Sequence, residues 1–399
     1  MSLLEKIASK ENLFSAWSLI NKNPYSYGID RKTIQSVRDN IYSEIQLINK
    51  ELLNKKFKFS PYRAHKLIKK GKKPRLLRIP TVTDRIVQKG ILNIIGPKFY
   101  SDFYDCSFGY REGRRISDAV FQILKHQSEG YFFVLEADIE KFFDTVDKEK
   151  LFEMVMGKLK KSVSLELLLK DSLNAEIGNP EMLSYQEIEL LNNQEIGIPQ
   201  GGILSPLYAN IYLTSFDKKM FEAGFKLVRY ADDFIVLCKT KEEAQKAHSF
   251  CIEILENQLK LRLHPLEYTG AGKTTISDFK RGFKYLGIQF GNDYICPAEA
   301  SVKKFKNKLE ELTNFKQINF LLDNLIKLSG LVYGWGNAYQ FCKNSKTEDI
   351  FKALDIFVFK RTDAMLKGLK FLPNSQTLSN AQLELLKIPK LLEIYKKYN

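Results

Sequence analysis

Two adjacent carboxylates, Asp232 and Asp233, are the residues of this 399-residue sequence whose types and spacing most directly suggest chemistry. They stand between two apolar runs with the composition of β-strands, where a hairpin turn is expected. Hairpin turns prefer Asn-Gly or Asp-Gly, whereas two neighbouring carboxylates repel each other unless a cation compensates their charge. The pair therefore favours a metal site over an ordinary acidic turn.

A third carboxylate, Asp138, ends the apolar segment 131–138. By itself, an aspartate in that position is more often a helix N-cap than a metal ligand. Mg²⁺ takes few protein carboxylates and keeps phosphate and water ligands, and two such ions roughly 3.5–4 Å apart stabilise both oxygens of an in-line displacement at phosphorus. The three aspartates together predict a nucleotidyl-transfer site with two Mg²⁺ ions, for which Mn²⁺ would substitute.

A glycine-rich segment from Gly197 to Gly202 precedes a helix expected over 203–223. Pro199 fixes the turn, and the glycines allow a backbone to approach a ligand closely. Gln200 can donate or accept a hydrogen bond at a sugar or a base. This pattern is only moderately specific on its own.

The charge balance favours a polyanionic partner. The chain carries 62 Lys and Arg against 47 Asp and Glu, a formal net charge of +15. Eleven Lys and Arg and no acidic residue fall between 55 and 78, around an expected hairpin with its turn at 71–74. Such a run is usually a solvated face, but a basic hairpin also suits phosphate contact, which we favour. The segment 171–195 is acidic and should face away from nucleic acid.

Other metal sites and a membrane location are disfavoured. The five cysteines form no C-x-x-C pair, and the four histidines lack zinc-ligand spacing, which leaves a hard cation held by carboxylates. No apolar run reaches about 18 residues, and the N-terminus has no apolar signal core. We expect a cytoplasmic protein with free thiols and no membrane partner.

The order of expected elements predicts an α+β fold with a split β-α-β sheet. Residues 12–60 read as largely helical, with Ile34 to Leu52 on one helix face. The other expected helices are 84–100, 114–129, 147–170, 203–223, 241–259 and most of 300–399, and the expected strands are 131–138, 225–230, 234–238 and 283–290.

The same motifs resemble those of reverse transcriptases, and more narrowly the group II intron-encoded branch of bacterial enzymes. The matching blocks, in chain order, are Tyr27 to Asp30, Arg75 to Gln88, Ser107 to Arg114, Pro199-Gln200-Gly201-Gly202 with Ser205-Pro206, Tyr230-Ala-Asp-Asp233, Gly282 to Gly287, and Leu328 to Tyr339. The resemblance spans residues 10–370. It implies a right-hand polymerase that makes DNA on an RNA template.

The resemblance also implies roles for single residues. Asp138 and Asp232 bind the catalytic metals, Asp233 completes the acidic cluster, and the carbonyl of Ile139 adds a ligand. Phe143 stands where the family keeps an aromatic gate against the 2′-hydroxyl of ribonucleotides.

Further residues match the family's contacts with nucleotide and nucleic acid. Gln200 matches a contact to the incoming nucleotide, and Arg75 with Lys69 or Lys70 matches fingers residues that hold the triphosphate. Lys273 lies near a family lysine that protonates pyrophosphate. The basic residues expected to contact nucleic acid are Lys70, Lys72, Lys73, Arg78, Arg85, Arg111 and Arg114.

The implied architecture has three parts. Residues 1–130 form an N-terminal extension and fingers, 131–292 form a ferredoxin-like palm with a fingers insertion at about 145–197, and 293–399 form a helical thumb. Expected partners are an RNA template, a DNA or RNA primer, deoxynucleoside triphosphates and a cognate non-coding or intron RNA. The short C-terminal part favours a stand-alone enzyme, and antiphage defence is a candidate role.

Two other functions are compatible with parts of the pattern. A group II intron maturase or RNA-binding splicing cofactor would use the same basic fingers and thumb, but would not need the whole metal and nucleotide constellation. An RNA-dependent RNA polymerase also pairs a strand aspartate with an Asp-Asp hairpin. Tyr230-Ala-Asp-Asp and the bulky Phe143 argue against that third function.

Overall fold

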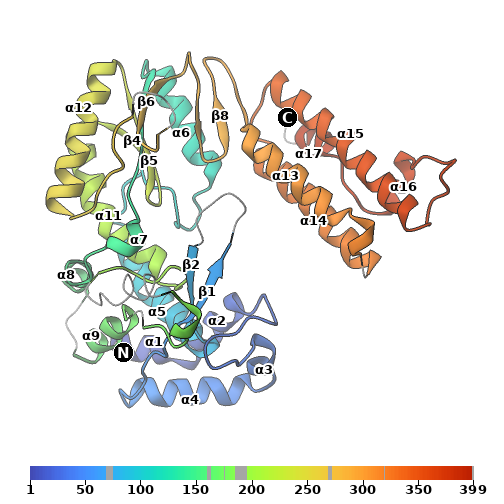
Figure 1. Ribbon diagram of the computed structural model, residues 1–399. Coiled ribbons are helices and arrows are strands. Elements are labelled where there is room, and N and C mark those ends of the chain that lie inside the picture. Colours follow the sequence, from blue (N-terminus) through green and yellow to red (C-terminus); the bar gives the residue numbers. More distant parts are fainter. Residues whose placement is uncertain are drawn as a thin grey trace. The chain divides into compact units, whose positions relative to one another are not determined.

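The chain is described from a computed structural model, which covers residues 1–68, 75–159, 163–174, 176–184, 196–267, 272–318 and 320–397. Contacts divide it into two compact units, Met1–Ile276 and Ser277–Asn399, which are described separately (Figure 1). Both units combine helices with antiparallel strands. The predicted α+β class is confirmed.

Short capped helices open the first unit. They are α1 (Leu3–Ala8), α2 (Lys10–Ile20), α3 (Ile34–Asp39) and α4 (Ile41–Leu53), and α1, α2 and α4 pack on the long helix α5 (Val82–Tyr100). Hydroxyl caps begin four of these five helices, at Ser2, Ser9, Thr33 and Thr81, where each side chain accepts a backbone N–H. The single helix face expected from Ile34 to Leu52 is interrupted at Asn40, where α3 ends and α4 begins.

The basic hairpin predicted near residue 72 is present as strands β1 (Arg63–Leu67) and β2 (Arg75–Ile79). They pair antiparallel, with Arg63 opposite Ile79 and Leu67 opposite Arg75. Residues 69–74 between the strands, which include Lys69, Lys70, Lys72 and Lys73, lie outside the described part of the chain. Residues 185–195 of the acidic stretch, which was predicted to face away from nucleic acid, also lie outside the described part of the chain.

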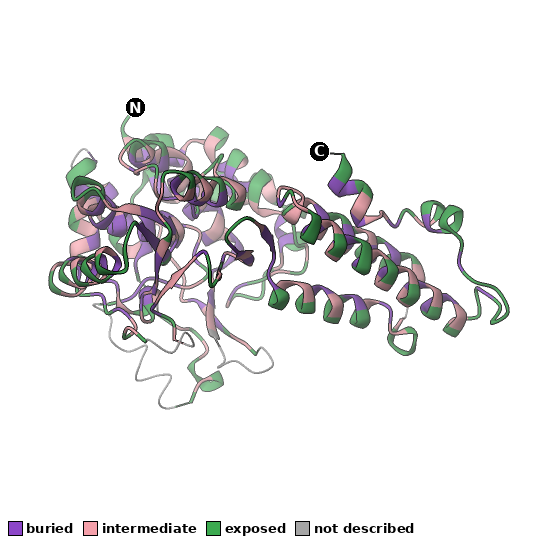
Figure 2. Ribbon diagram, turned by 90° about the horizontal axis from the view of Figure 1, so that it is seen from above, coloured by how far each residue is buried: buried purple, intermediate pink, exposed green. Residues whose placement is uncertain are grey.

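A four-stranded sheet forms the centre of the first unit, and its last strand ends two residues beyond Ile276. Its strands are β3 (Phe133–Asp138), β4 (Lys226–Tyr230), β5 (Asp233–Cys238) and β6 (Thr275–Asp278), in the order β4-β5-β3-β6. Strand β5 pairs antiparallel with both β3 and β4, and every residue of β5 after Asp233 is buried. Figure 2 draws the buried residues of the chain in purple. This sheet brings together the two segments that carry the predicted carboxylates.

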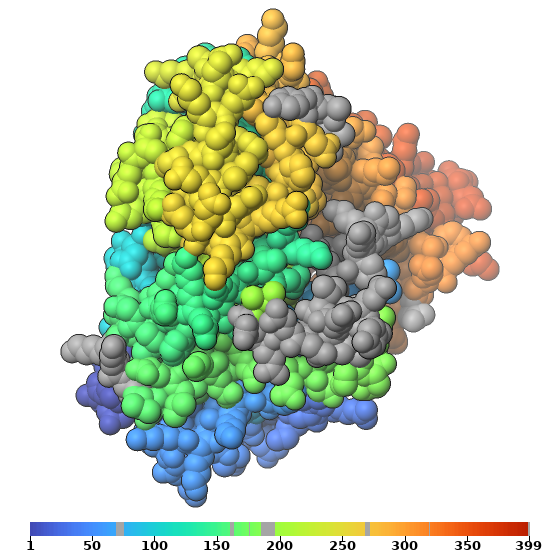
Figure 3. Space-filling view, turned by 60° about the vertical axis from the view of Figure 1, so that its left-hand side comes forward, coloured from blue at the N-terminus to red at the C-terminus, as the bar shows by residue number. Residues whose placement is uncertain are grey.

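Helices pack on this sheet and on the segments leading to it. Those in contact with its strands are α6 (Ile116–Ser128), α11 (Ser205–Glu222) and α12 (Lys241–Ile252), which continues as a π-helical turn (Glu253–Gln258). The other helices among the described residues of the unit are α7 (Phe142–Thr145), α8 (Lys148–Lys158), α9 (Val163–Ser172) and a 3₁₀ turn (Pro180–Met182). On the face drawn in Figure 3, the segment after α12 lies beside the segment of α7 and α8, where Lys260 contacts Asp147 at 3.1 Å.

The second unit starts with a small sheet and continues as helices. Its elements are β7 (Phe283–Tyr285), β8 (Ile288–Phe290), β9 (Ile295–Pro297), α13 (Glu299–Leu312), a 3₁₀ turn (Phe315–Gln317), α14 (Leu321–Tyr339), α15 (Ser345–Gly368), α16 (Asn380–Leu385) and α17 (Leu391–Lys396). The single strand predicted over 283–290 is wrong. Leu286 and Gly287 take left-handed φ values of 50° and 81°, which reverse the chain and pair Phe283 with Phe290.

Candidate active site

The three predicted aspartates meet at one end of the central sheet. Asp138, the last residue of β3, lies directly opposite Asp233, the first residue of β5, in the antiparallel register. Asp232 precedes Asp233 in the turn from β4, and Ala231 before it has a left-handed φ of 63°. Strand pairing therefore joins residues that are 95 positions apart in sequence.

The electrostatics of the cluster show mutual repulsion. Desolvation and then the carboxylates of Asp138 and Asp232 raise the pKa of Asp233 to about 7, although the residue keeps substantial exposed surface. A divalent cation would relieve this repulsion, and carboxylate oxygens are the ligands that Mg²⁺ prefers. The donor set thus fits the predicted metal, although no three-ligand group in metal-binding geometry is found among the described residues.

Asp138 instead has protein partners. Lys273 Nζ donates to its Oδ2 at 2.6 Å, and His264 Nε2 lies 3.7 Å from the same oxygen. The segment that carries His264 pairs with the residues after β3, because the N–H of His264 donates to the carbonyl of Asp138 and Ile139 bridges to Leu263. Lys273, which the family resemblance associates with pyrophosphate, thus donates a hydrogen bond to a predicted metal ligand.

His264 was missed by the sequence analysis. It contacts Asp138 and lies 3.5 Å from Glu140 through its other ring nitrogen. No local sequence signal could have found it, because His264 is 126 residues from Asp138 in sequence and only the folded chain brings its segment against the end of β3. Ile139, predicted as a backbone ligand, is buried directly after Asp138.

The raised pKa of Asp233 gives a stability prediction. Because the pKa in the folded protein is about 7 and the ordinary value is 3.8, ionisation of Asp233 opposes folding as pH rises between those values. Asp233→Asn should raise the melting temperature of the metal-free protein at pH 8, and the gain should shrink as pH falls towards 4. Calorimetry in EDTA measures this, and an equal gain at pH 4 and pH 8 would contradict it.

The glycine-rich loop is held by backbone bonds to two other predicted site segments. The N–H of Ile198 donates to the carbonyl of Phe143 at 2.7 Å, and the N–H of Arg78 on β2 donates to the carbonyl of Gln200 at 2.7 Å. Gly201 has a φ of 116°, and a Cβ there would lie 2.6 Å from the Arg78 carbonyl oxygen, so glycine is required. These bonds place Phe143 and Gln200 on one continuous framework with the basic hairpin.

Side chains complete that framework. Ser205 Oγ donates to the carbonyl of Pro199 at 2.6 Å, and Gln88 Oε1 accepts from the N–H of Ile203 at 2.9 Å. Gln88 Nε2 in turn donates to the buried Tyr62 hydroxyl at 3.0 Å. Gln88 was part of a matched motif without an assigned role, and its contacts show that it supports the loop.

The arginines predicted to contact nucleotide or nucleic acid differ in their burial and in their partners within the protein. The side chain of Arg75 lies outside the description, while Arg78 is 7% exposed and burial lowers its pKa. Arg85 donates to the Pro80 carbonyl and the Ser26 hydroxyl, and Arg111 donates to the carbonyls of Tyr104 and Ser107. Arg114 pairs with Asp105 at 2.5 Å. The side chains of Arg85, Arg111 and Arg114 thus have partners within the protein, whereas the buried Nε of Arg78 has no hydrogen-bond partner among the described residues. The contact of all four arginines with nucleic acid stays a prediction.

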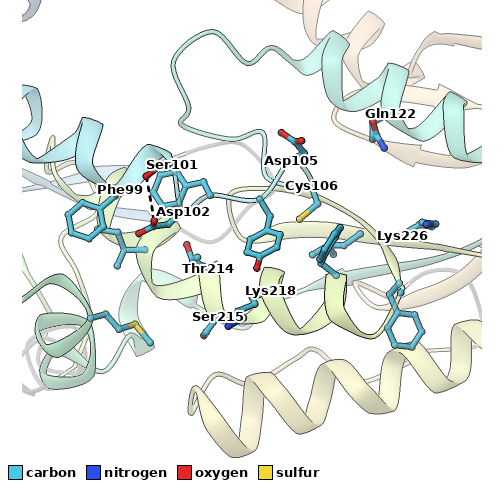
Figure 4. Close-up of a pocket in the computed structure, with 18 of the residues that line it drawn as sticks. Phe99, Ser101, Asp102, Asp105, Cys106, Gln122, Thr214, Ser215, Lys218 and Lys226 are labelled. Carbon is cyan, nitrogen blue, oxygen red and sulfur yellow. Dashed lines mark hydrogen bonds between the residues drawn. The ribbon is translucent and has the colours of Figure 1, made fainter. Parts of the chain in front are cut away.

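A cavity of about 1000 Å³ lies elsewhere in the first unit. Figure 4 shows Thr214, Ser215 and Lys218 of α11 on one side of it and the segment from Phe99 to Cys106 on another. None of the three aspartates lines it. The site of the predicted chemistry is therefore the open strand end, as distinct from this cavity.

An antiparallel sheet that presents a strand-end aspartate beside an Asp-Asp hairpin, next to a glycine-rich loop, defines a template-directed polymerase palm. The model of the reverse transcriptase (RNA-dependent DNA polymerase) family matches residues 67–290, more than half of the chain. The chain belongs to this family. The class predicted from the sequence is thereby confirmed.

Relatives agree with the predicted branch. Protein YkfC of Escherichia coli K12 is 28% identical over 308 residues, which cover 68% of this chain and 77% of that protein. The group II intron-encoded protein LtrA of Lactococcus lactis subsp. cremoris is 28% identical over 305 residues, 75% of this chain. The match spans only 45% of LtrA's length.

Solved structures give looser matches. A chain of a Cas6-RT-Cas1–Cas2 complex is 26% identical with a TM-score of 0.37, covering 65% of this chain and 43% of that one. Telomerase from Candida albicans is 11% identical with a TM-score of 0.41, covering 92% and 66%. Superpositions this loose support no inference about this chain.

Among the described residues, no helix has the length and apolarity needed to cross a membrane.

Proposed function

We propose that this protein copies an RNA template into DNA by extending a primer, with Asp138, Asp232 and Asp233 holding two Mg²⁺ ions. The observation that supports this most directly is the register that sets Asp138 opposite Asp233, beside a carboxylate pair whose charges repel. When bound, the two ions would stabilise the attacking and leaving oxygens at the α-phosphate. Mn²⁺, which shares the preference for oxygen ligands, would substitute.

The protein's own residues would orient the nucleotide. Gln200 and Phe143 would contact the incoming deoxynucleotide from the loop framework, and Arg75 with Lys69 or Lys70 would hold its triphosphate. The carbonyl of Ile139 would add a metal ligand. Lys273 would exchange its bond to Asp138 for a contact with the departing pyrophosphate once cations occupy the carboxylates.

We assign the parts of the chain as in other right-hand polymerases: fingers in 1–130 with an insertion at about 145–197, palm in 131–292 and thumb in 293–399. The partners would be template RNA, a DNA or RNA primer and a cognate structured RNA in the cytoplasm. Antiphage defence is one candidate role for such an enzyme. The similarity to LtrA also supports a second candidate, a splicing cofactor for an intron RNA, in which polymerisation is secondary.

The decisive experiment is primer extension on a defined RNA template with the purified protein. We expect DNA synthesis that needs Mg²⁺ or Mn²⁺ and stops with EDTA. RNA binding without any synthesis, over the full range of both metals and with several primers, would leave only the splicing cofactor. Sequencing the RNA that co-purifies would then identify the partner.

RNA binding should depend steeply on salt. The chain carries a net charge of +15, and each phosphate contact releases counterions, so four or more contacts lower affinity by roughly 100-fold between about 50 and 200 mM salt. Fluorescence anisotropy with a labelled RNA measures the slope. A change below roughly threefold would contradict a phosphate-dominated interface.

A further inference from the structure

Arg229 is a fully buried arginine on β4, two residues before the Ala231–Asp232 turn. Its Nε donates to Asp217 Oδ1 at 2.7 Å and its Nη2 to Asp217 Oδ2 at 2.5 Å, a bidentate pair with α11. Neither side chain has any exposed surface. The sequence analysis gave neither residue a role.

The remaining donors of the guanidinium are also used. Nη2 donates to Ser107 Oγ at 2.9 Å, and Nη1 donates to Asn210 Oδ1 at 3.0 Å and to the carbonyl oxygen of Ala231 at 2.9 Å. With the Asp217 bonds, all five N–H donors of an arginine have acceptors. Only the rigid five-donor fork of arginine can satisfy this geometry.

The Ala231 bond connects the network to the carboxylates. Ala231 is buried at 6% exposure with a φ of 63°, a conformation that costs free energy for a residue with a Cβ and persists only when its surroundings impose it. Asp232 follows directly. The direction in which the Asp-Asp pair points therefore depends on what holds Ala231.

A second segment, residues 106–109, also contacts this turn through its backbone. A Cβ on Gly109 would lie 2.4 Å from the nitrogen of Ala231, so the two backbones are in direct contact. The N–H of Phe108 donates to the Arg229 carbonyl at 2.8 Å, and the Gly109 carbonyl accepts from Asn210 Nδ2 at 2.9 Å. The turn is thus enclosed between the arginine network and the loop 106–109.

We propose that Arg229 is a positioning residue for catalysis: by holding the Ala231 carbonyl, it fixes the turn that aims Asp232 and Asp233 at the metal ions. The inference rests on the metal assignment in the proposed function. Because its side chain has no exposed surface, Arg229 would act through the turn and not by contact with metal or substrate. A buried ion pair is by itself weak evidence for stability, because well-packed apolar residues often replace one without loss of stability. Stability alone therefore does not explain this network, and its bond to the Ala231 carbonyl supports a role in orienting the turn.

The test separates aiming from folding with a double variant, Arg229→Met with Asp217→Leu. Removing both charges leaves no buried charge unpaired, so the protein should fold and keep its RNA affinity. Losing the Ala231 bond should weaken Mn²⁺ binding to the protein without nucleic acid by roughly 10- to 100-fold, as expected for loss of a residue that orients metal ligands. Electron paramagnetic resonance titration measures the binding, and the Mg²⁺ concentration for half-maximal primer extension should rise in parallel.

Two further variants complete the design. Tyr212 lies on α11, as Asp217 does, and its hydroxyl donates a buried hydrogen bond of 2.7 Å to the Leu259 carbonyl. Tyr212→Phe removes this bond and should lower stability without changing Mn²⁺ affinity. Arg229→Lys keeps a charge against Asp217 but loses the fork, and should weaken Mn²⁺ binding even if the double variant does not fold. Wild-type Mn²⁺ affinity in the folded double variant, or in Arg229→Lys, overturns the inference. Absence of Mn²⁺ binding and DNA synthesis in the wild type would instead overturn the proposed function.

Discussion

Asp232→Ala should abolish DNA synthesis, with a loss of roughly 1000-fold or more, while RNA binding stays near the wild-type value. Stabilisation of transition-state charge by the metal ions is worth several kcal/mol, and each 1.36 kcal/mol corresponds to a factor of ten in rate. The phosphate contacts expected to dominate RNA affinity would be made by basic residues outside the carboxylate cluster. Single-turnover primer extension and anisotropy with the same RNA measure the two quantities.

The control for this variant is Glu222→Ala. Glu222 ends α11, and its side chain forms an exposed 3.7 Å ion pair with Lys218, so its loss should change neither activity nor binding. If Asp232→Ala keeps more than a few per cent of the wild-type rate, the metal assignment is refuted. A parallel loss of RNA binding would instead point to a general structural defect.

Phe143→Val should weaken discrimination against ribonucleotides by roughly 10- to 100-fold, the range that a change of pocket shape supplies. The ring is half buried, packs edge-on against Phe142 with centroids 5.4 Å apart, and its backbone carbonyl accepts the bond from Ile198. Valine removes the ring that would clash with a 2′-hydroxyl and leaves the backbone bond in place. The measurement is the ratio of kcat/KM for a ribonucleotide to that for the matching deoxynucleotide.

Phe142→Leu is the matched comparison. Phe142 is 1% exposed and belongs to the core, so its replacement should lower stability without changing the sugar preference. An unchanged ratio in Phe143→Val would remove the gate assignment.

Much of the fold and the central carboxylates could be predicted from local pattern. Apolar strand runs with a turn between them predicted β4 and β5 and put Asp232 and Asp233 at the tip of the hairpin. The same reasoning failed at 283–290, where Leu286 adopts a left-handed φ and turns one expected strand into two. A non-glycine residue in that conformation leaves little trace in composition, because the surrounding structure imposes it.

Contacts between distant segments could not be predicted in this way. The sequence by itself determined which residues are carboxylates, which runs are apolar enough to be strands, and which family the ordered motifs resemble. Only the tertiary structure decided that Lys273 and His264 lie on Asp138, that Arg78 is buried beneath the glycine-rich loop, and that Arg229 holds the turn before Asp232. The physical reason is that local pattern depends on neighbours along the chain, whereas these contacts depend on strand register and side-chain packing between segments up to 135 residues apart.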